Sequence, residues 1–504
     1  MPAKVLVLGF DAMERDLVLD LAAKGRMPNF AALGQGTHLD GPMDLLPGGI
    51  WAELLYGKTA GEVGEFFVPY QLHTGENVPR PLLLGEGDPR RQFWGHLAGT
   101  GERVCIIDSY WGAPAPGVDG MQVFCWAGHD DEFGPRADSD ASMKRWTDLA
   151  GPPLDHSDCD RVAAAPGGLA VLKRQCLRTI EGKTNALETL LNEDWGLMFV
   201  TFAEAHCIGH QAWHMMPAAL GGQDRKAPPG AEDAPTHVYE ALDGALGRIT
   251  AAAGPDTKVV VVLSHGMGRY YGGPTLLPEL LVRLGYSSAG PDTPWKRRVR
   301  LTRRQLVRFS GKKPLGRLMR KVARFKAVEA MQGRVGARVV GLADPRTRAI
   351  AVENNRVGAI RLNLQGREPD GSVTPAEAPA LLERMRQEFL ELRTPDKEPV
   401  IERVVLASEA YGPDRHPDLP DLLIVFRRDA PITAVWSERV GTVGRGPRRR
   451  YIPRTGDHTD HTTLWVRGQR LPAKASTLDL APTILALMGR KTPQLQGRPL
   501  VRDA

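Results

Sequence analysis

Carboxylate and imidazole side chains follow directly after several short apolar runs of this chain. The runs and their polar neighbours are KVLVLGF (4–10) before Asp11, RVCIID (103–108) with Asp108, LMFVTF (197–202) before Glu204 and His206, and KVVVVLS (258–264) before His265. These residue types bind divalent metals such as zinc and also act as acids or bases. Because ligands of open α/β sheets bind at the carboxyl ends of the strands, we expect a ligand site there.

Two neighbouring pairs in these segments could take part in chemistry. His206 and His210 are four residues apart, so a helix would place both on one face, although His214 continues the same spacing. Ser264 adjoins His265, but adjacent residues of a strand point to opposite faces. The sequence LSHGM also lacks the pattern of a G-x-S-x-G nucleophile elbow. We therefore do not assign Ser264 as a nucleophile.

The composition is that of an ordinary globular protein. The chain has 504 residues, of which 42% are hydrophobic and 25% charged, so it can bury a large core. The N-terminus lacks the features of a secretory signal, and no apolar run has the eighteen or so residues needed to span a bilayer. Because the five cysteines are scattered and never form CxxC, we expect reduced thiols and a cytoplasmic location.

The apolar runs predict an α/β fold. They are continuous rather than alternating, which is typical of strands buried on both faces of a mostly parallel central sheet flanked by helices on both faces. Further runs occur at 421–426 (DLLIVF) and 462–467 (TTLWVR). Because strands resume after residue 400, we expect a core of residues 1–286 and 401–504, with 287–400 as an inserted basic helical segment and smaller cap domain.

Positive charge is concentrated in one segment. Residues 296–338 hold sixteen Lys or Arg and one acid, Glu329, so this segment is +15 within a net charge of +6. It could be a solvated helical cap, a lid that attracts a polyanionic substrate, or an attachment to anionic lipid or nucleic acid anchored by Trp295 and Phe309. Because no nucleic-acid module accompanies it, we favour a cap with an anion-attracting role.

Read together, the strand ends resemble the alkaline-phosphatase-like superfamily, and within it the type I phosphodiesterase/nucleotide pyrophosphatase family. The matching segments are VLVLGFDAM with GRMPNFAAL, LSHGMG (263–268), GDHTDHTTLWVRG (456–468), STLDLAPTILALMG (476–489) with LQGRPL (495–500), and TRAIAVENNRVGAIRLNLQGREPDGSV (347–373). The resemblance implies two divalent cations, usually zinc, about 4 Å apart and clamping a phosphoryl group.

The resemblance also implies which residues bind metal. Its first Asp matches Asp11, its paired Asp and His fall on His206 and His210, its late His matches His458, and the His of its Ser-Asp-His-Gly element matches His265. His206, His210 and His458 would then hold one zinc ion. The second site keeps only Asp11 and His265, because Ser264 replaces an Asp, so we expect it to be weak or absent.

Two assignments keep an alternative. Asp11 could instead begin a helix-capping box with Glu14 in the acidic position. Glu204 could be a further metal ligand or could orient an imidazole from the outer shell. Asp108, with His129, Asp130 and Asp131, we take as surface residues.

The nucleophile implied by the family is missing. In LPGGIWAELLYGKTAG (46–61) its position, counted back from Trp51, falls on Pro47 or, with a shift, on Gly48 or Gly49. No Ser, Thr or Cys occurs between Leu39 and Lys58. Gly48 would contribute only its backbone, and a glycine there would let an acceptor or a larger substrate approach the metal closely.

Three functions are compatible with these features. The first is a metal-dependent hydrolase or transferase that acts on a small or polymeric anionic ester, with water or an acceptor hydroxyl activated by the metal. The second is a non-catalytic relative that binds an anionic ligand through the crevice and the basic insert. The third is a peripheral scaffold on an anionic membrane or nucleic acid through 296–338. We favour the first, with nucleic acid the least expected partner.

Overall fold

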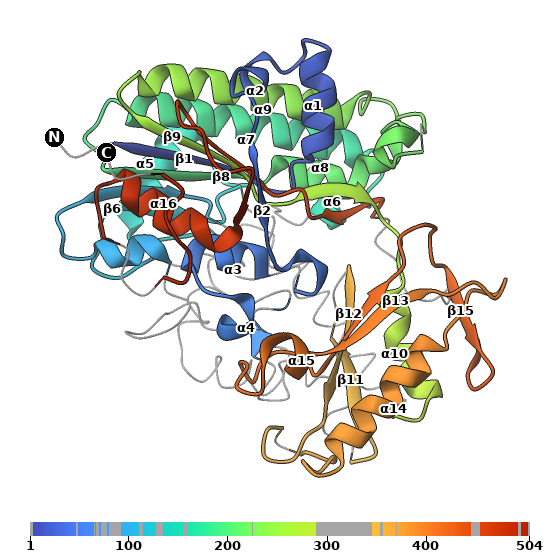
Figure 1. The fold of residues 1–504 in the computed structure, drawn as a ribbon. Coiled ribbons are helices and arrows are strands. Elements are labelled where there is room, and N and C mark those ends of the chain that lie inside the picture. The colour runs from blue at the N-terminus through green and yellow to red at the C-terminus, as the bar shows by residue number, and fades with distance from the viewer. Residues whose placement is uncertain are drawn as a thin grey trace, which may run out of the picture.

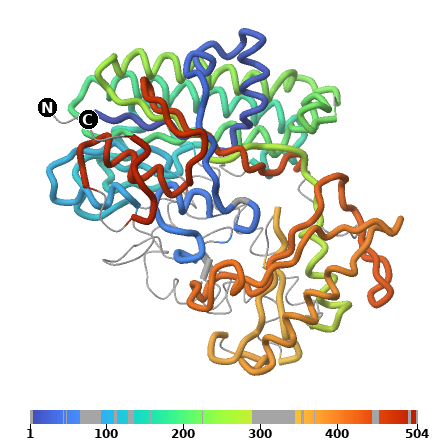
Figure 2. Tube along the Cα trace, in the orientation of Figure 1, coloured from blue at the N-terminus to red at the C-terminus, as the bar shows by residue number. Residues whose placement is uncertain are grey.

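The described residues of the computed structural model form a nine-stranded sheet, a four-stranded sheet and three two-stranded ones. Figures 1 and 2 show the nine-stranded sheet, hereafter called the larger sheet, above the four-stranded one, hereafter called the smaller sheet. The residues that the structure describes are 4–46, 49–64, 66, 70–71, 78–79, 92–109, 114–127, 135–154, 159–223, 225–288, 345–352, 356–368, 370–444, 454–491 and 495–501. The basic segment 296–338 and the polar residues His129, Asp130 and Asp131 therefore lie outside them. No helix in these ranges is long and apolar enough to cross a membrane.

The larger sheet has nine strands, and its centre is parallel as the sequence predicts. In spatial order the strands are β19 (Lys474–Ser476), β2 (Thr37–Asp40), β18 (Thr463–Val466), β9 (Lys258–Leu263), β1 (Val5–Phe10), β8 (Leu197–Phe202), β5 (Arg103–Ile107), β6 (Asp119–Phe124) and β7 (Arg136–Ala137). β18 runs antiparallel to both β9 and β2, and β7 antiparallel to β6.

Helices cover both faces of this sheet (Figure 1), which also confirms the prediction. Side chains of β1 alternate between two cores, with Leu6 and Leu8 in one and Val5 and Val7 in the other. The helices against the first face are α1 (Arg15–Ala23), α2 (Pro28–Ala32), α5 (Asp140–Ala150), α6 (Cys159–Ala163), α7 (Gly168–Leu190), α8 (Glu204–Ala212) and α9 (Ala234–Ala253). Those against the second are α3 (Gly49–Tyr56) and α16 (Leu480–Leu487), and α4 (Ala60–Val63) follows α3.

The smaller sheet corrects the predicted boundaries of the insertion. Its order is β11 (Ala349–Val352), β12 (Val357–Leu362), β14 (Leu422–Phe426) and β13 (Ile401–Leu406), all antiparallel. It packs with α10 (Leu277–Arg283) and α14 (Ala378–Leu390), while α15 (Ala407–Tyr411), β15 (Ala434–Ser437) and β16 (Gly441–Gly444) complete this unit. The larger sheet therefore resumes after residue 444 and not at residue 401, and α10 belongs to the smaller unit although it precedes residue 287.

The run DLLIVF was assigned to the wrong sheet for a physical reason. In β14, Leu422 and Ile424 face the core of the smaller unit. Leu423 and Val425 face a second cluster that includes Leu46 and Ala60 of the larger unit. An antiparallel strand buried on both faces has the same continuous apolar pattern as a central parallel strand, so the pattern alone does not distinguish them.

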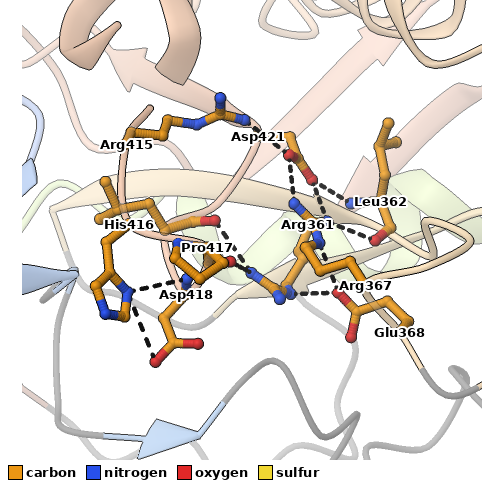
Figure 3. A network of polar contacts seen from close by, with 10 residues as sticks. Arg361, Leu362, Arg367, Glu368, Arg415, His416, Pro417, Asp418 and Asp421 are labelled. Carbon is orange, nitrogen blue, oxygen red and sulfur yellow. Dashed lines mark hydrogen bonds and ion pairs between the residues drawn. The ribbon is translucent and has the colours of Figure 1, made fainter. Parts of the chain in front are cut away.

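Buried ion pairs join β12 to the residues that follow it, and these residues to Asp421 directly before β14 (Figure 3). Arg361 Nε lies 2.8 Å from Glu368 Oε1, and Arg367 binds Asp421 with two parallel bonds of 2.7 and 2.8 Å. In the loop before β14, the His416 N–H donates to Gly61 O in α4 at 3.1 Å. Breaking a buried pair of this kind typically costs about 3–5 kcal/mol. The charged residues of IRLNLQGRE thus have a structural role within the smaller unit, and the His416 backbone joins the same loop to α4.

Candidate metal centre

The carboxyl ends of three adjacent parallel strands bring the predicted site residues together. Asp11 directly follows β1, α8 begins two residues after β8, and His265 lies two residues after the end of β9. A two-stranded antiparallel ladder of β10 (Gly266–Arg269) and β17 (Gly456–Thr459) pairs Met267 with His458. This ladder places His458, which is almost two hundred residues further along the chain, at the same edge of the sheet.

Three imidazoles converge at this edge. His206 Nε2 lies 2.8 Å from His210 Nε2, and His458 Nε2 lies 2.9 Å from His206 Nε2 and 3.1 Å from His210 Nε2. His206 and His210 are four residues apart on α8, as the spacing predicts, and both are buried. His214, the next in the spacing, lies in a following turn, where its Nδ1 is 3.1 Å from Thr455 Oγ1.

The partners of Nδ1 in His206 and His210 determine which nitrogen of each ring carries the proton. His210 Nδ1 is 2.8 Å from Gly456 O, and since a carbonyl only accepts, the ring donates from Nδ1. His206 Nδ1 is 2.8 Å from Asp11 Oδ2, a carboxylate oxygen that also accepts. In neutral rings both Nε2 atoms then carry lone pairs, yet they lie 2.8 Å apart. A cation between them removes this repulsion, so the donor set fits a metal ion.

Asp11 serves this cluster through His206 in the structure. Its Oδ1 accepts hydrogen bonds from Trp51 Nε1 at 2.8 Å and from Ser264 Oγ at 3.0 Å, while Oδ2 faces His206. Burial by itself would raise the pKa of Asp11, but His206, with His265 and Trp51, holds that pKa below its usual range. An ionised carboxylate behind an imidazole orients the ring and increases its basicity.

The capping-box interpretation of Asp11 is wrong, because Glu14 is the N-cap of α1 and accepts from Asp16 N at 3.0 Å. The other contacts of the Glu14 carboxylate are with Met267 N (3.0 Å), Thr459 Oγ1 (2.7 Å) and His461 Nδ1 (2.5 Å). Glu14 thus binds both strands of the β10–β17 ladder that carries His458. Sequence reasoning missed this role, although an acid near a strand end was a signal.

Glu14, Asp16 and His461 also place ligand atoms close enough together to hold an ion. The hydrogen bonds of Glu14 to the β10–β17 ladder already use this carboxylate structurally.

His265 lies against the cluster without joining it. Its ring stacks on that of His458 with centroids 4.3 Å apart, and its Nε2 is 3.6 Å from Asp11 Oδ1. Burial lowers the pKa of His265 to about 4 although Asp11 opposes this shift. Burial also lowers the pKa of His458, with the neighbouring imidazoles adding to the effect. Both rings are therefore neutral near pH 7, and His265 Nδ1 has no hydrogen-bond partner among the described residues.

Glu204 is placed in a different buried cluster. Its Oε1 lies 3.3 Å from Lys183 Nζ, which also contacts Asp108 Oδ2 at 3.0 Å and donates to Thr201 O at 2.8 Å. Burial raises the pKa of Glu204, and Lys183 opposes this. The contacts described for Glu204 thus lie in this cluster, and its proposed role beside an imidazole stays a prediction. Asp108 is buried here, so its assignment to the surface is wrong.

The nucleophile loop can be followed only in part. Gly48 and Pro47 lie outside the described residues, and Gly49 begins α3 with its N–H donating to Leu46 O at 2.8 Å. Trp51 extends from the first turn of α3 to Asp11, to which its Nε1 donates a hydrogen bond. The first turn of α3, which follows the predicted nucleophile positions in sequence, therefore contacts the site through Trp51.

Comparison with known proteins identifies the fold. No family model and no curated protein matches the chain. Among solved structures, phosphonoacetate hydrolase from Sinorhizobium meliloti 1021, in complex with phosphonoformate, is 13% identical, with 97% of this chain and 96% of that chain covered at a TM-score of 0.50. Murine ectonucleotide pyrophosphatase/phosphodiesterase 5 is 12% identical, with coverages of 98% and 97% and a TM-score of 0.47. The first likeness confirms the predicted fold, as identities this low show no more than that.

Proposed function

From an alkaline-phosphatase-like fold with three converging imidazoles, we propose that this chain is a metal-dependent hydrolase or transferase of a phosphoryl or related anionic ester. The observation that carries the proposal is the convergence of Nε2 of His206, His210 and His458 within 3.1 Å of one another. Three neutral imidazoles with an open fourth position are a ligand set that zinc uses in catalytic sites.

The residues around the cluster would have different roles in the reaction. Asp11 and the Gly456 carbonyl keep the protons of His206 and His210 on Nδ1, so that both Nε2 atoms face inward. A zinc ion held there would act as a Lewis acid and lower the pKa of a water molecule or acceptor hydroxyl. The Asp11 carboxylate, whose Oδ1 lies 3.6 Å from His265 Nε2, favours a proton on that nitrogen.

Two contacts favour direct attack over a covalent intermediate. Ser264, which adjoins His265 in sequence, donates its hydroxyl proton to Asp11 Oδ1 and so stabilises the ionised carboxylate. Trp51 Nε1 donates to the same oxygen. Because these two donors and His206 occupy both oxygens of Asp11, we propose a single firm zinc site and assign Asp11 to its outer shell.

The experiment compares full-length protein loaded with zinc, treated with a chelator, and reloaded. We expect hydrolysis of p-nitrophenyl phosphate, bis-p-nitrophenyl phosphate or phenylphosphonate esters by the loaded form, its loss with dipicolinate, and its return with zinc. Protein that binds zinc but hydrolyses none of these esters would favour the non-catalytic relative instead. Hydrolysis that survives complete zinc removal would contradict metal dependence.

A further inference from the structure

The helix and the strand that carry the three imidazoles meet without side chains between them. A Cβ atom added at Gly456 of β17 would lie 2.3 Å from the carbonyl oxygen of Gly209 in α8, which is closer than a side chain allows. A Cβ atom added at Gly209 would lie 2.8 Å from Met267 Cγ of β10. The β10–β17 ladder therefore packs directly on α8, and a small shift between them would move His458 relative to the two imidazoles of the helix.

Asp160 joins α8 to the chain that leads into β17. It belongs to α6 and is buried. Its Oδ1 accepts a hydrogen bond from Gln211 Nε2 of α8 at 2.5 Å. Arg454, two residues before β17, donates from Nε to Oδ1 at 2.9 Å and from Nη2 to Oδ2 at 2.7 Å. One carboxylate thus binds both elements that supply the imidazoles.

The residues after Arg454 run along the end of α8. The N–H of Thr455 donates to the carbonyl of His210 at 2.7 Å, and Gly456 O accepts from His210 Nδ1 at 2.8 Å. Residues 454–456 therefore bind the helix or its partner Asp160 one after another. The first of these contacts, between Arg454 and Asp160, fixes where this segment begins.

The contact between Arg454 and Asp160 is an ion pair. Burial by itself would lower the pKa of Arg454, but the hydrogen bonds and the charge of Asp160 raise that pKa above its usual value, so the guanidinium stays charged. Two parallel bonds between a guanidinium and a carboxylate fix the orientation of both groups more closely than a single bond does. Asp160 therefore holds Arg454 in one geometry while it also binds Gln211.

We propose that Asp160 is a positioning residue of the metal centre. By binding Gln211 and Arg454 together, it fixes β17 against α8 and so keeps the third imidazole at the other two. Ligands held in this way are preorganised for the ion, and a displacement of about 0.5 Å would already weaken the site. The inference rests on the proposed function for the metal at the three imidazoles, but not for hydrolysis.

The test uses full-length protein and measures metal binding without turnover. Competition with a chromophoric chelator gives the zinc affinity, and the visible absorption bands of cobalt-loaded protein report the coordination geometry. Asp160→Asn keeps the shape of the side chain but leaves one acceptor oxygen for the donors of Gln211 and Arg454, so one contact is lost. We expect zinc affinity to fall by about tenfold or more and the cobalt bands to shift.

Asp421→Asn is the matched control. Asp421 is also buried, and it accepts two parallel bonds of 2.8 and 2.7 Å from Arg367 within the smaller unit. We expect this variant to unfold at lower urea concentration but to keep the zinc affinity and the cobalt spectrum of the wild type. Equal changes of affinity and spectrum in both variants would show a general loss of stability and would overturn the inference.

A second variant keeps the charges and is milder. In Arg454→Lys the ammonium group cannot make two parallel bonds to Asp160, so the cobalt bands should shift again, whereas Arg367→Lys should leave them unchanged. Wild-type affinity and spectrum in folded Asp160→Asn or in Arg454→Lys would overturn the inference and leave the proposed function standing. Wild-type protein that binds neither zinc nor cobalt would overturn both, so the two failures are distinguishable.

Discussion

His458→Ala should lose its zinc and should hydrolyse anionic esters at least roughly a thousandfold more slowly than the wild type. The substitution removes His458 Nε2, which lies 2.9 Å from His206 Nε2 and 3.1 Å from His210 Nε2, so only two ligands remain. The Lewis-acid contribution of a catalytic metal is several kcal/mol, which corresponds to at least this factor in rate. Elemental analysis gives zinc per chain, and steady-state kinetics gives the rate.

The matched control for this substitution is His214→Ala. His214 continues the spacing of His206 and His210, yet its ring contacts Thr455 and not the cluster. We expect this variant to keep both zinc and turnover. A folded His458→Ala protein with a full zinc content and an unchanged rate would show that the imidazoles do not form the site.

Asp11→Asn should weaken zinc binding by about 10–100-fold, the usual effect of losing an outer-shell carboxylate. The amide oxygen can keep the hydrogen bonds from Trp51 and Ser264, which leaves the NH₂ group facing His206 Nδ1. A donor at that position favours the tautomer with its proton on Nε2, and such a ring cannot bind metal through Nε2. Because Asn has the same shape as Asp, a change in zinc affinity would report which nitrogen of His206 carries the proton.

Competition with a chromophoric chelator measures this affinity, and Asp20→Asn is the control because Asp20 is a carboxylate on α1 that pairs with Lys24 at 2.6 Å and belongs to neither group of potential metal ligands. We expect Asp20→Asn to bind zinc like the wild type. If Asp11→Asn did so too, the carboxylate would not orient His206.

The central strands and the imidazole cluster were predictable because each depends on a short sequence signal. Continuous apolar runs gave β1, β8 and β9 to within a residue, and the ends of parallel strands must meet at one edge. The spacing of His206 and His210 needed only a helix to bring them together. His458 could be placed only through the resemblance, since its position depends on the pairing of β17 with β10.

The parts that the sequence did not predict depend on tertiary contacts. Nothing local to Arg356 indicates that its guanidinium contacts the backbone carbonyl of His458. Asp108 was taken as exposed because the partner that buries it, Lys183, is on a helix far along the chain. Glu14 resembled an ordinary capping residue, and its bonds to β10 and β17 appear only once the strands are assembled.

The claim that three imidazoles hold one zinc ion is tested most directly by anomalous diffraction from crystals of the full-length protein. Data collected on either side of the zinc absorption edge should show one strong difference peak, about 2 Å from Nε2 of His206, His210 and His458. Absence of a peak at these three nitrogens in protein shown to contain zinc, or a peak bound by other side chains, would contradict the claim.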